Sequence, residues 1–391
     1  MNFDIVVCGG GIAGAFASIA AARRGGNVLL CEKGGTLGGS ITASQVGFIL
    51  DAKNKDGLIR EFIGELDEEM KKDAASIFEI EKYLLEKMCV EAGVHLFYHS
   101  TVTDVKVENG IISSVEIAAP KAKLDVSTKI VIDATGNGDV AAMSGCEFEL
   151  GNDEGKTQPM SVLGTITGLG DGARKYVGFC NRHAFKEYLD SIGVKTSMGF
   201  PNMTYIGGGA HVLSINHEYG VGFDDGEKRA NALIDGRREL YDVVRALKES
   251  KDVFENIALI STPELIGIRE GRRIKGRYCV SIDDVISGRE HEDAVCKVTY
   301  WVDIHALDKN GNCSFFGDDI ECKPYDIPFR AQLPIGVDNL ILAGRCISGD
   351  FFAHASYRVA GNMACTGEAA GIVAQRCVAE DKLPIQIDYK K

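Results

Sequence analysis

Short apolar runs and a segment of small residues alternate at the start of the chain in a pattern typical of a parallel βαβ unit. Ile5 to Cys8 and Asn27 to Cys31 are apolar runs of strand length. Between them, residues 13–24 carry small and apolar side chains at helical spacing. Strands that are apolar at every position are buried between helices on both faces of a sheet. The pattern predicts an α/β fold with a parallel sheet.

The next part of the chain predicts two packed helices and then antiparallel strands. Apolar residues at spacings of three and four indicate helices over 57–72 and 80–92. From Val94 to Ile132 the period changes to two, with Asn109-Gly110 as a tight-turn signal. This alternation predicts a hairpin or small β-meander. It ends in a buried strand at 129–133.

The middle of the chain differs from both ends in its sequence pattern. Glycine-rich turns, a long charged helix over 227–250 and an alternating segment at 295–307 set it apart. We expect an inserted α+β domain here, between two parts of one nucleotide-binding domain. The expected boundaries are 1–150, 151–334 and 335–391.

The end of the chain returns to the strand-then-helix pattern. A buried strand at 339–343 runs into Gly344-Arg345, and a helix rich in small residues spans Asn362 to Glu380. Asn362 is the expected N-cap of that helix. The two ends of the chain are therefore expected to share one domain.

Glycines after the first strand turn this fold prediction into a binding prediction. Gly9, Gly11 and Gly14 read G-x-G-x-x-G. The first glycine permits a tight turn, the second lets a pyrophosphate approach the backbone, and the third lets the helix pack closely on the sheet. Free N–H groups at the start of the helix, around Ile12 and Ala13, then face the phosphates.

An acidic residue ends the second strand, as a dinucleotide site requires. Glu32 lies 21 residues after Gly11, where a carboxylate accepts hydrogen bonds from a ribose diol, and it is followed by Lys33. An acid at this place argues against a 2′-phosphate. A glycine turn used only for packing is the alternative, but the flanking strands, the helix and Glu32 favour a dinucleotide site.

Composition and charge narrow the class of protein. The 391 residues suffice for two domains, and 45% hydrophobic with 25% charged is ordinary for a globular protein. The formal charge of −13 disfavours nucleic acid and anionic membranes as partners. No run of about 18 apolar residues exists, and Asp4 stands where a signal peptide needs a basic start, so we expect a cytoplasmic protein without a membrane span.

The twelve cysteines do not form a metal or disulfide pattern. No two of them are spaced C-x-x-C, and several fall within apolar strand or helix patterns. Free cysteine in such places behaves as a small hydrophobe. We expect buried, reduced thiols and no metal site.

Small residues recur at two more places where an extended cofactor would touch the backbone. Gly38 and Gly39, followed by Ser40, lie in a glycine-rich loop after the second strand. Ala134-Thr135-Gly136 follows the strand at 129–133. A mononucleotide would need neither place.

Together these motifs resemble the two-dinucleotide-binding-domain flavoproteins. Within them the chain is similar to the FAD-dependent oxidoreductase family that includes relatives of fumarate reductase and succinate dehydrogenase flavoprotein subunits. The resemblance implies a Rossmann-like, glutathione-reductase-type FAD-binding domain with a parallel sheet and a β-meander, and an inserted substrate domain over the cofactor. It rests on GGGIAGAFASIAAARRGGNVLLCEK, GGTLGGS, VIDATGNGD, TPELIGIREGRRIKGRY, PYDIPFRAQLP and LILAGRCISGDFFAHASYRVAGNMACTGEAAGIVA.

The resemblance also implies roles for particular residues. Gly9, Gly11, Gly14 and Glu32 would hold the ADP half of FAD, and the Gly38-Gly39 loop would lie along the diphosphate and the ribityl chain. Val102 would offer backbone atoms to adenine, and Ala134 to Gly136 would line the AMP side. Asn362 and Met363 would open a helix whose amino terminus faces the flavin ring.

Two departures from the family pattern matter. Gly344-Arg345 stands where many such proteins have glycine and an acid on the ribityl chain, so the contact of Arg345 stays open. The loop Leu37-Gly38-Gly39-Ser40-Ile41 has no histidine for covalent flavin attachment. We therefore expect noncovalent FAD.

His354 and Arg358 are the expected substrate residues. Their H-x-x-x-R spacing, between the last strand and the last helix, resembles a substrate-binding pair in fumarate reductase relatives. His354 would transfer a proton and Arg358 would clamp a carboxylate or oxyanion. The alternatives are a salt bridge for Arg358 and a buried core position for His354.

A charged cluster earlier in the chain is the second choice. Like charges four apart, as at Arg269 and Arg273, would share one face of a helix, so at least one of them needs a counterion. A solvated or salt-bridged face is favoured over an anion pocket. The cluster comprises Arg269, Glu270, Arg272, Arg273, Lys275 and Arg277.

The function expected from these features is that of an FAD-dependent oxidoreductase. It would transfer a hydride between flavin N5 and a small polar substrate, such as a carboxylate or hydroxyl compound. Oxygen, a nicotinamide or a redox protein would be the separate electron acceptor or donor. Two alternatives stay open: an NAD-linked dehydrogenase that uses only the first βαβ unit, and a flavin-containing electron-relay or structural subunit without its own substrate. The substrate, the direction and whether the chain forms a homo-oligomer are open as well.

Overall fold

A five-stranded parallel sheet lies at the centre of the computed structural model, which describes residues 1–308 and 320–389. Its strand order is β16-β7-β1-β2-β3. The four strands from β16 to β2 are buried along their whole length, as parallel strands covered on both faces must be. The α/β fold predicted from the apolar runs is confirmed. The strands are β1 (Ile5–Cys8), β2 (Val28–Cys31), β3 (His95–Phe97), β7 (Ile130–Asp133) and β16 (Leu340–Leu342).

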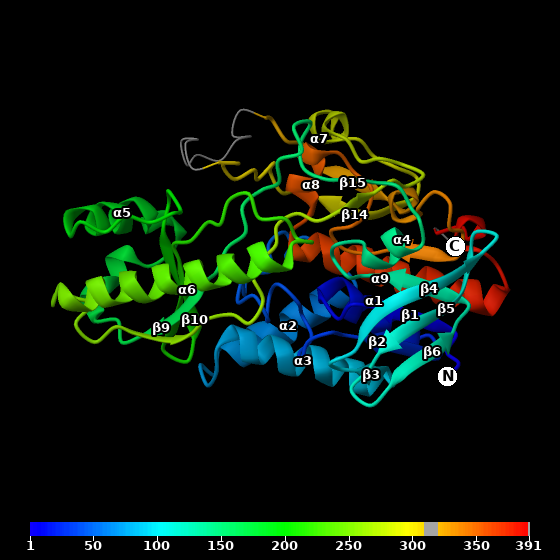
Figure 1. The fold of residues 1–391 in the computed structure, drawn as a ribbon, viewed down its shortest axis with the longest axis horizontal. Helices are drawn as coiled ribbons and strands as arrows, with labels where there is room; N and C mark the ends of the chain where they lie inside the picture. Colours follow the sequence, from blue (N-terminus) through cyan, green and yellow to red (C-terminus); the bar gives the residue numbers. More distant parts are fainter. Residues whose placement is uncertain (309–319, 390–391) are drawn as a thin grey trace.

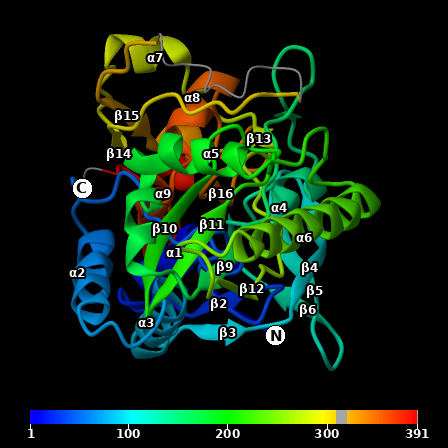
Figure 2. The same ribbon diagram turned by 90° about the vertical axis from the view of Figure 1, so that its left-hand side faces the viewer.

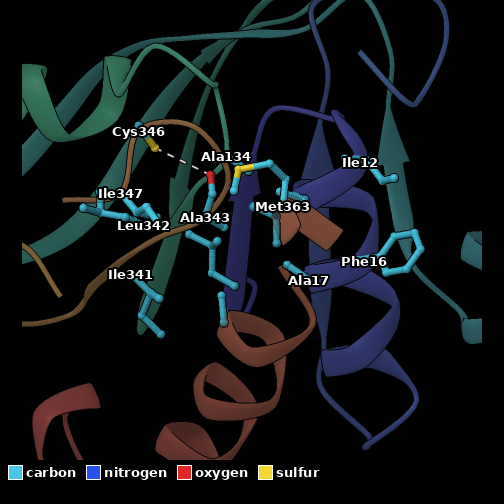
Figure 3. Close-up of a cluster of buried hydrophobic side chains, with 14 of the residues drawn as sticks. Ile12, Phe16, Ala17, Ala134, Ile341, Leu342, Ala343, Cys346, Ile347 and Met363 are labelled. Atoms are coloured by element: carbon cyan, nitrogen blue, oxygen red, sulfur yellow. Dashed lines mark hydrogen bonds between the residues drawn. The ribbon is translucent and has the colours of Figure 1, made fainter. Parts of the chain in front are cut away.

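Two helices from opposite ends of the chain pack together beside this sheet. They are α1 (Ile12–Ala22) and α9 (Ala360–Glu380). A Cβ atom at Gly367 or Gly371 of α9 would lie 2.1 Å from a backbone carbonyl oxygen of α1, so only glycine permits this approach. Figure 3 shows Met363 of α9 packed among side chains of α1 and residues at the ends of β7 and β16.

The start of α9 differs from the expectation. The helix begins at Ala360, with Val359 as its N-cap residue, and Asn362 is buried within the first turn. The predicted N-cap at Asn362 is wrong. Its side chain instead faces β14 (Ala294–Val298), where the Cys296 thiol lies 3.4 Å from its Oδ1.

An antiparallel sheet confirms the predicted meander. It is formed by β4 (Thr101–Glu108), β5 (Ile111–Ala118) and β6 (Lys123–Ser127). Asn109 and Gly110, which join β4 to β5, have φ angles of 50° and 77°. A two-residue hairpin turn needs positive φ at both positions, and Asn-Gly satisfies that need.

A second unit with its own core projects to one side of the parallel sheet (Figure 1). Its antiparallel sheet has the order β10-β11-β9-β12, and the long helix α6 (Gly226–Glu249) runs beside it. Viewed from that side, α5, β10 and α6 stand in front of the parallel sheet (Figure 2). The other elements of the unit are β9 (Gly164–Thr167), β10 (Asn202–Gly207), β11 (Ala210–Ser214), β12 (Ala258–Ser261) and α5 (Arg182–Ser191).

The apolar contacts divide the chain differently from the expected boundaries. Buried residues of the second core lie between Met160 and Ile266. Described residues between Ile274 and Leu333, among them those of β14 and β15 (Tyr325–Pro328), contribute buried side chains to the core of the parallel sheet instead. We infer that the inserted unit is shorter than 151–334, and we call residues 160–266 the inserted unit below.

Shorter elements complete the fold. No helix in the two described ranges is both long and apolar enough to cross a membrane. The remaining helices and strands are α2 (Leu58–Met70), α3 (Ile77–Ala92), α4 (Asp139–Met143), α7 (Ile282–Ser287), α8 (Phe351–Tyr357), β8 (Phe148–Glu149) and β13 (Arg273–Ile274), with 3-10 turns at Asp171–Tyr176, Phe179–Asn181, Phe329–Gln332 and Pro384–Gln386.

Candidate functional site

A large cavity opens at the carboxyl edge of the parallel sheet. The strand ladder sets the last residues of β1, β2 and β7 level with one another, so the loops that follow these strands meet at one place. In the sheet, β1 lies between β2, to which the chain runs next, and β7, which comes later in the chain. Open α/β sheets bind ligands at such a point, beyond the carboxyl ends of the strands, and the cavity lies there. The empty space within the cavity and at its mouth, which is open to solvent, amounts to about 1240 Å³.

Most of the residues expected to bind a cofactor line this one cavity. Two of them do not: Gly14 packs against the Gly9 carbonyl, and Asn362 is buried near Cys296. Those that line it are Gly9, Gly11, Ile12, Ala13, Glu32, Lys33, Gly38, Gly39, Ser40, Val102, Ala134, Thr135, Gly136, Gly344, Arg345 and Met363.

The three glycines of the first loop are needed for three different reasons. A Cβ at Gly9, which has φ 99°, would lie 2.5 Å from the carbonyl oxygen of Ala134. A Cβ at Gly14 would lie 1.8 Å from the carbonyl oxygen of Gly9. At Gly11, by contrast, a Cβ would meet no described protein atom within 4 Å. Packing therefore requires the first and third glycines, whereas the middle one leaves bare backbone facing the cavity.

The second glycine loop lies directly against the first. The Gly38 N–H donates to the carbonyl oxygen of Gly10 at 2.8 Å. A Cβ at Gly39 would come within 3.1 Å of Gly11 Cα. The two loops thus form one backbone wall, and side chains on either loop would close the space beside it.

Glu32 holds this wall in place as well as facing the cavity. It is 7% exposed, and its two carboxylate oxygens accept the N–H groups of Gly10 and Gly34, each at 2.6 Å. A carboxylate offers about four acceptor positions, so about two remain for a ligand. The sequence predicted the ligand contact but not this structural one.

Buried polar atoms without a partner gather at the cavity. They are Asn137 Oδ1 and the Nε atoms of Arg229, Arg345 and Arg358, none of which has a hydrogen-bond partner among the described residues. Burial, with Arg358 nearby, lowers the pKa of Arg345. Leaving such atoms unpaired costs about 1–3 kcal/mol each, so a polar ligand that pairs with them would be strongly favoured.

The match of a protein-family model decides the family. The model described as FAD dependent oxidoreductase matches residues 4–391. The chain belongs to the FAD dependent oxidoreductases. No curated protein matches it in sequence.

Solved structures of flavoenzymes share the fold of this FAD dependent oxidoreductase. A geranylgeranyl bacteriochlorophyll reductase-like protein from Thermoplasma acidophilum is 15% identical, with a TM-score of 0.51 over 97% of this chain and 79% of that chain. The flavin-dependent brominase Bmp2 is 14% identical, with a TM-score of 0.50 over 100% of this chain and 81% of that chain. At such low identity the likeness establishes the fold alone. The finer likeness to fumarate reductase relatives stays a prediction.

FAD is the cofactor of this family, and the cavity suits it. The motifs predict that the glycine loops hold its diphosphate and that Glu32 binds a ribose, and these contacts stay predictions. Four cations line the cavity, namely Lys33, Arg229, Arg345 and Arg358, against the two carboxylates of Glu32 and Asp139. Arg358 pairs with Asp303 and Asp139 pairs with Arg272, so Lys33, Arg229 and Arg345 stand against Glu32 alone. This excess of two positive charges would balance the two negative charges of a diphosphate.

The structure separates the two residues expected to bind substrate. Arg358, at the end of α8, lines the cavity and donates to the backbone oxygen of Asp303 at 2.8 Å and to its carboxylate at 3.3 Å. His354 is fully buried, with its ring in edge contact with Tyr357, and does not line the cavity. Burial, together with Arg273, holds the pKa of His354 well below its ordinary value. This matches the core position that was the alternative for His354.

A cluster of polar side chains surrounds Arg358 at the border with the inserted unit. We call it the roof cluster. Arg269 donates to the Pro159 carbonyl at 2.6 Å and lies 3.5 Å from His217 Nε2. The rings of His217 and His305 are 5.0 Å apart, and His305 Nε2 lies 3.6 Å from a carboxylate oxygen of Asp303. Its members are Gln158, His217, Arg269, Asp303, His305 and Arg358.

The charges of the roof cluster follow from burial and from its two arginines. Burial and the nearby Arg269 lower the pKa of His305 to about 4 and that of His217 further still, so both rings are neutral at pH 7. Burial opposes ionisation of Asp303, but His305 and Arg358 outweigh it and keep its pKa well below the usual range. Because a guanidinium only donates, His217 Nε2 accepts from Arg269, and the ring proton faces the Tyr219 hydroxyl, 3.2 Å from Nδ1.

The charged cluster at 269–277 separates into distinct roles. The prediction of a helix over this segment is wrong, because its only regular element is the short strand β13. Glu270 accepts from backbone N–H groups at 3.0 and 3.2 Å and pairs with Arg273, while Arg272 pairs with Asp139 at 2.9 Å. The salt-bridged alternative therefore holds for these residues. Arg269 differs, since its partners belong to the roof cluster.

Several residues of this site were not predicted from the sequence, among them Gln158 of the roof cluster. His217, Asp303 and His305 lie in the roof cluster, and Arg229 of α6 lines the cavity. One signal was available: Asp303-x-His305 interrupts an apolar alternating run with two polar residues at a spacing of two, which places both on one face of an extended segment.

Proposed function

We propose that this FAD dependent oxidoreductase transfers a hydride between its flavin and a small organic carboxylate bound by Arg269 and Arg358. The supporting observation is the charge of the roof cluster. The six residues of the cluster include two guanidinium groups but one carboxylate, that of Asp303, while both of its histidines are neutral. One more negative charge, carried by a substrate, would balance them.

Other acids near the cluster are already engaged. Glu239 accepts from Ser197 and Asn216, and Glu218 accepts from Asn216 at 2.7 Å. Burial, with Arg358 close by, lowers the pKa of Arg269 to about 10, a further sign of cations lacking full compensation. A carboxylate is the planar acceptor that a guanidinium fork binds best.

His305 is our choice for the proton-transfer group. The flavin supplies the hydride acceptor or donor, so the protein must manage the accompanying proton. With a hydroxy acid as substrate, the neutral imidazole of His305 would take the proton of the hydroxyl group next to the C–H bond that is oxidised. Asp303, which His305 shares with Arg358, would stabilise the imidazolium.

An anaerobic screen tests this proposal. Glycolate, lactate, malate and succinate are added to the holoprotein, with the matching amides as neutral controls, while flavin absorbance is followed. We expect at least one carboxylate, but not its amide, to bleach the flavin. If no carboxylate bleaches or shifts the spectrum, and chemically reduced protein passes electrons only to a redox protein, the electron-relay alternative replaces this proposal.

Variants then assign the roles. Arg269→Met and Arg358→Met should keep the flavin but slow its reduction by about tenfold to a hundredfold, the worth of one charged hydrogen bond. Arg277→Met is the matched control, because Arg277 pairs with Asp338 at 2.9 Å and neither residue belongs to the roof cluster. His354→Phe should reduce at the wild-type rate, and a loss there would restore the assignment made from the sequence.

The flavin should be released by acid. We propose noncovalent binding because the loop around Gly38 and Gly39 has no histidine. Acid precipitation should leave a yellow supernatant and a colourless pellet. A yellow pellet would establish a covalent bond.

A further inference from the structure

Arg229 belongs to the inserted unit, yet its side chain reaches the cavity at the carboxyl edge of the parallel sheet. It lies in the first turn of α6, a helix of 24 residues that begins after Asp225. One end of α6 approaches the parallel sheet, and the helix extends from there along the inserted unit (Figure 1). Arg229 lines the same cavity as the glycine loops.

The guanidinium of Arg229 is only partly used by the protein. One nitrogen donates to the Phe223 carbonyl at 3.2 Å, and the buried Nε has no hydrogen-bond partner among the described residues. The nearby cavity acid, Asp139, is held by Arg272 at 2.9 Å. Within residues 1–308 and 320–389 no carboxylate forms an ion pair with Arg229.

Neighbouring contacts place Arg229 on the β7 side of the cavity. The Arg272 guanidinium stacks over the Phe223 ring at 4.6 Å and pairs with Asp139, which follows β7. Arg229 bonds to the backbone of that same Phe223. The β7 end also touches the first glycine loop, at Gly9 and Ala134.

We propose that Arg229 binds the diphosphate of the ADP half of FAD, so that the cofactor bridges the inserted unit and the parallel-sheet fold. Its cation is one of the three, with Lys33 and Arg345, that give the cavity its excess of positive charge. A charged donor with a free Nε and an anionic group beside bare glycine backbone are complementary. The proposal depends on FAD binding and not on the identity of the substrate.

Binding of cofactor fragments to the apoprotein tests this proposal directly. ADP and riboflavin are titrated separately into wild type and Arg229→Met by calorimetry. We expect Arg229→Met to weaken ADP and FAD by about tenfold to a hundredfold and to leave riboflavin unchanged. The matched control is Arg238→Met on the same helix, whose exposed side chain pairs with Asp235. Unchanged ADP affinity, or a loss confined to riboflavin, would overturn the proposal.

Hydrogen exchange of the wild-type protein gives a second test that needs no variant. ADP alone should slow exchange of the amides at the start of α6, because the bound diphosphate holds Arg229 and with it the first turn. Exchange at the far end of α6 should be unaffected and serves as the internal control. If ADP protects the glycine loops but not the first turn of α6, Arg229 does not bind it.

Discussion

The part of the cavity lined by the loops around Gly9, Gly38 and Gly136, which we call the glycine end, differs from the roof cluster in how the chain builds it. The glycine end is mostly backbone, and each of its loops follows a neighbouring strand, so a few close contacts such as that between Gly9 and Ala134 shape it. The roof cluster is made of side chains from five separate segments around residues 158, 217, 269, 304 and 358. The first is fixed by steric exclusion, whereas the second depends on charge balance. Substitutions should therefore break the two ends in different ways.

Gly14→Ala and Gly11→Ala should give the largest contrast. The methyl group at position 14 would clash with the Gly9 carbonyl, so we expect a loss of stability of about 1–3 kcal/mol or more and loss of FAD. At position 11 it enters open space, so the apoprotein should melt as wild type does while FAD binding weakens by roughly tenfold to a hundredfold. Melting of the apoproteins and FAD titration measure both. Equal melting temperatures for the two variants would contradict the division of roles.

Asp303→Asn tests the charge balance of the other end. We expect the variant to keep FAD but to slow flavin reduction by about a hundredfold or more, because His305 loses the group that stabilises its charged form. The wild-type pKa of His305 is about 4, so the rate should fall as pH drops toward that value. In Asp303→Asn the fall should move to lower pH, since Asp303 raises the pKa of His305. Asp293→Asn, which breaks only the pair with Arg330 at 2.9 Å, should keep the wild-type profile.

Glu32→Ala combines both kinds of effect. FAD affinity should fall by about tenfold to a hundredfold through loss of charged hydrogen bonds. The apoprotein should also melt at a lower temperature, because the Gly10 and Gly34 N–H groups lose their acceptor. Glu108→Ala, at an exposed site, is the control for both measurements. Unchanged FAD retention on dialysis would refute the contact with the ribose.

Glu81 shows that not every unpaired buried group belongs to the cavity. Its carboxyl group in α3 is fully buried without a hydrogen-bond partner among the described residues, and burial raises its pKa well above the usual value. The protonated form is therefore favoured in the fold, and stability is lost as pH rises from the unfolded pKa through the folded one. Glu81→Leu should be more stable by about 1–3 kcal/mol at neutral pH, and its advantage should shrink toward pH 4. The urea unfolding midpoints of both proteins should be measured at several pH values. A difference between the two midpoints that does not change with pH would contradict this prediction.

The sequence predicted the glycine end because each part of it has a local cause. Gly9, Gly11 and Gly14 occupy fixed positions between a strand and a helix, and their spacing alone implies the turn and the backbone approach. The positions of four buried strands, at 5–8, 27–31, 129–133 and 339–343, were predicted from apolar runs in the same way. Most residues named from these motifs accordingly line one cavity.

The roof cluster could not be predicted in this way because its members meet only in the folded chain. Arg269 and Arg273 looked equivalent in sequence, and the fold sends one to His217 and the other to Glu270. His354 was a reasonable choice by spacing, but a helix of seven residues turns its ring into the core. No local pattern distinguishes a buried face from a cavity face over so short a helix.

The close packing of α1 against α9 has a consequence for how the protein is made. Helix α1 is synthesised first, but Gly367 and Gly371, which let α9 approach it, come about 350 residues later. At 5–20 residues per second, roughly 20 to 70 seconds pass on the ribosome before α1 meets its partner. During that time its apolar surface is exposed to chaperones and to other nascent chains. Synthesis of the last helix, rather than of the glycine loop, thus sets the moment at which the cofactor site can close.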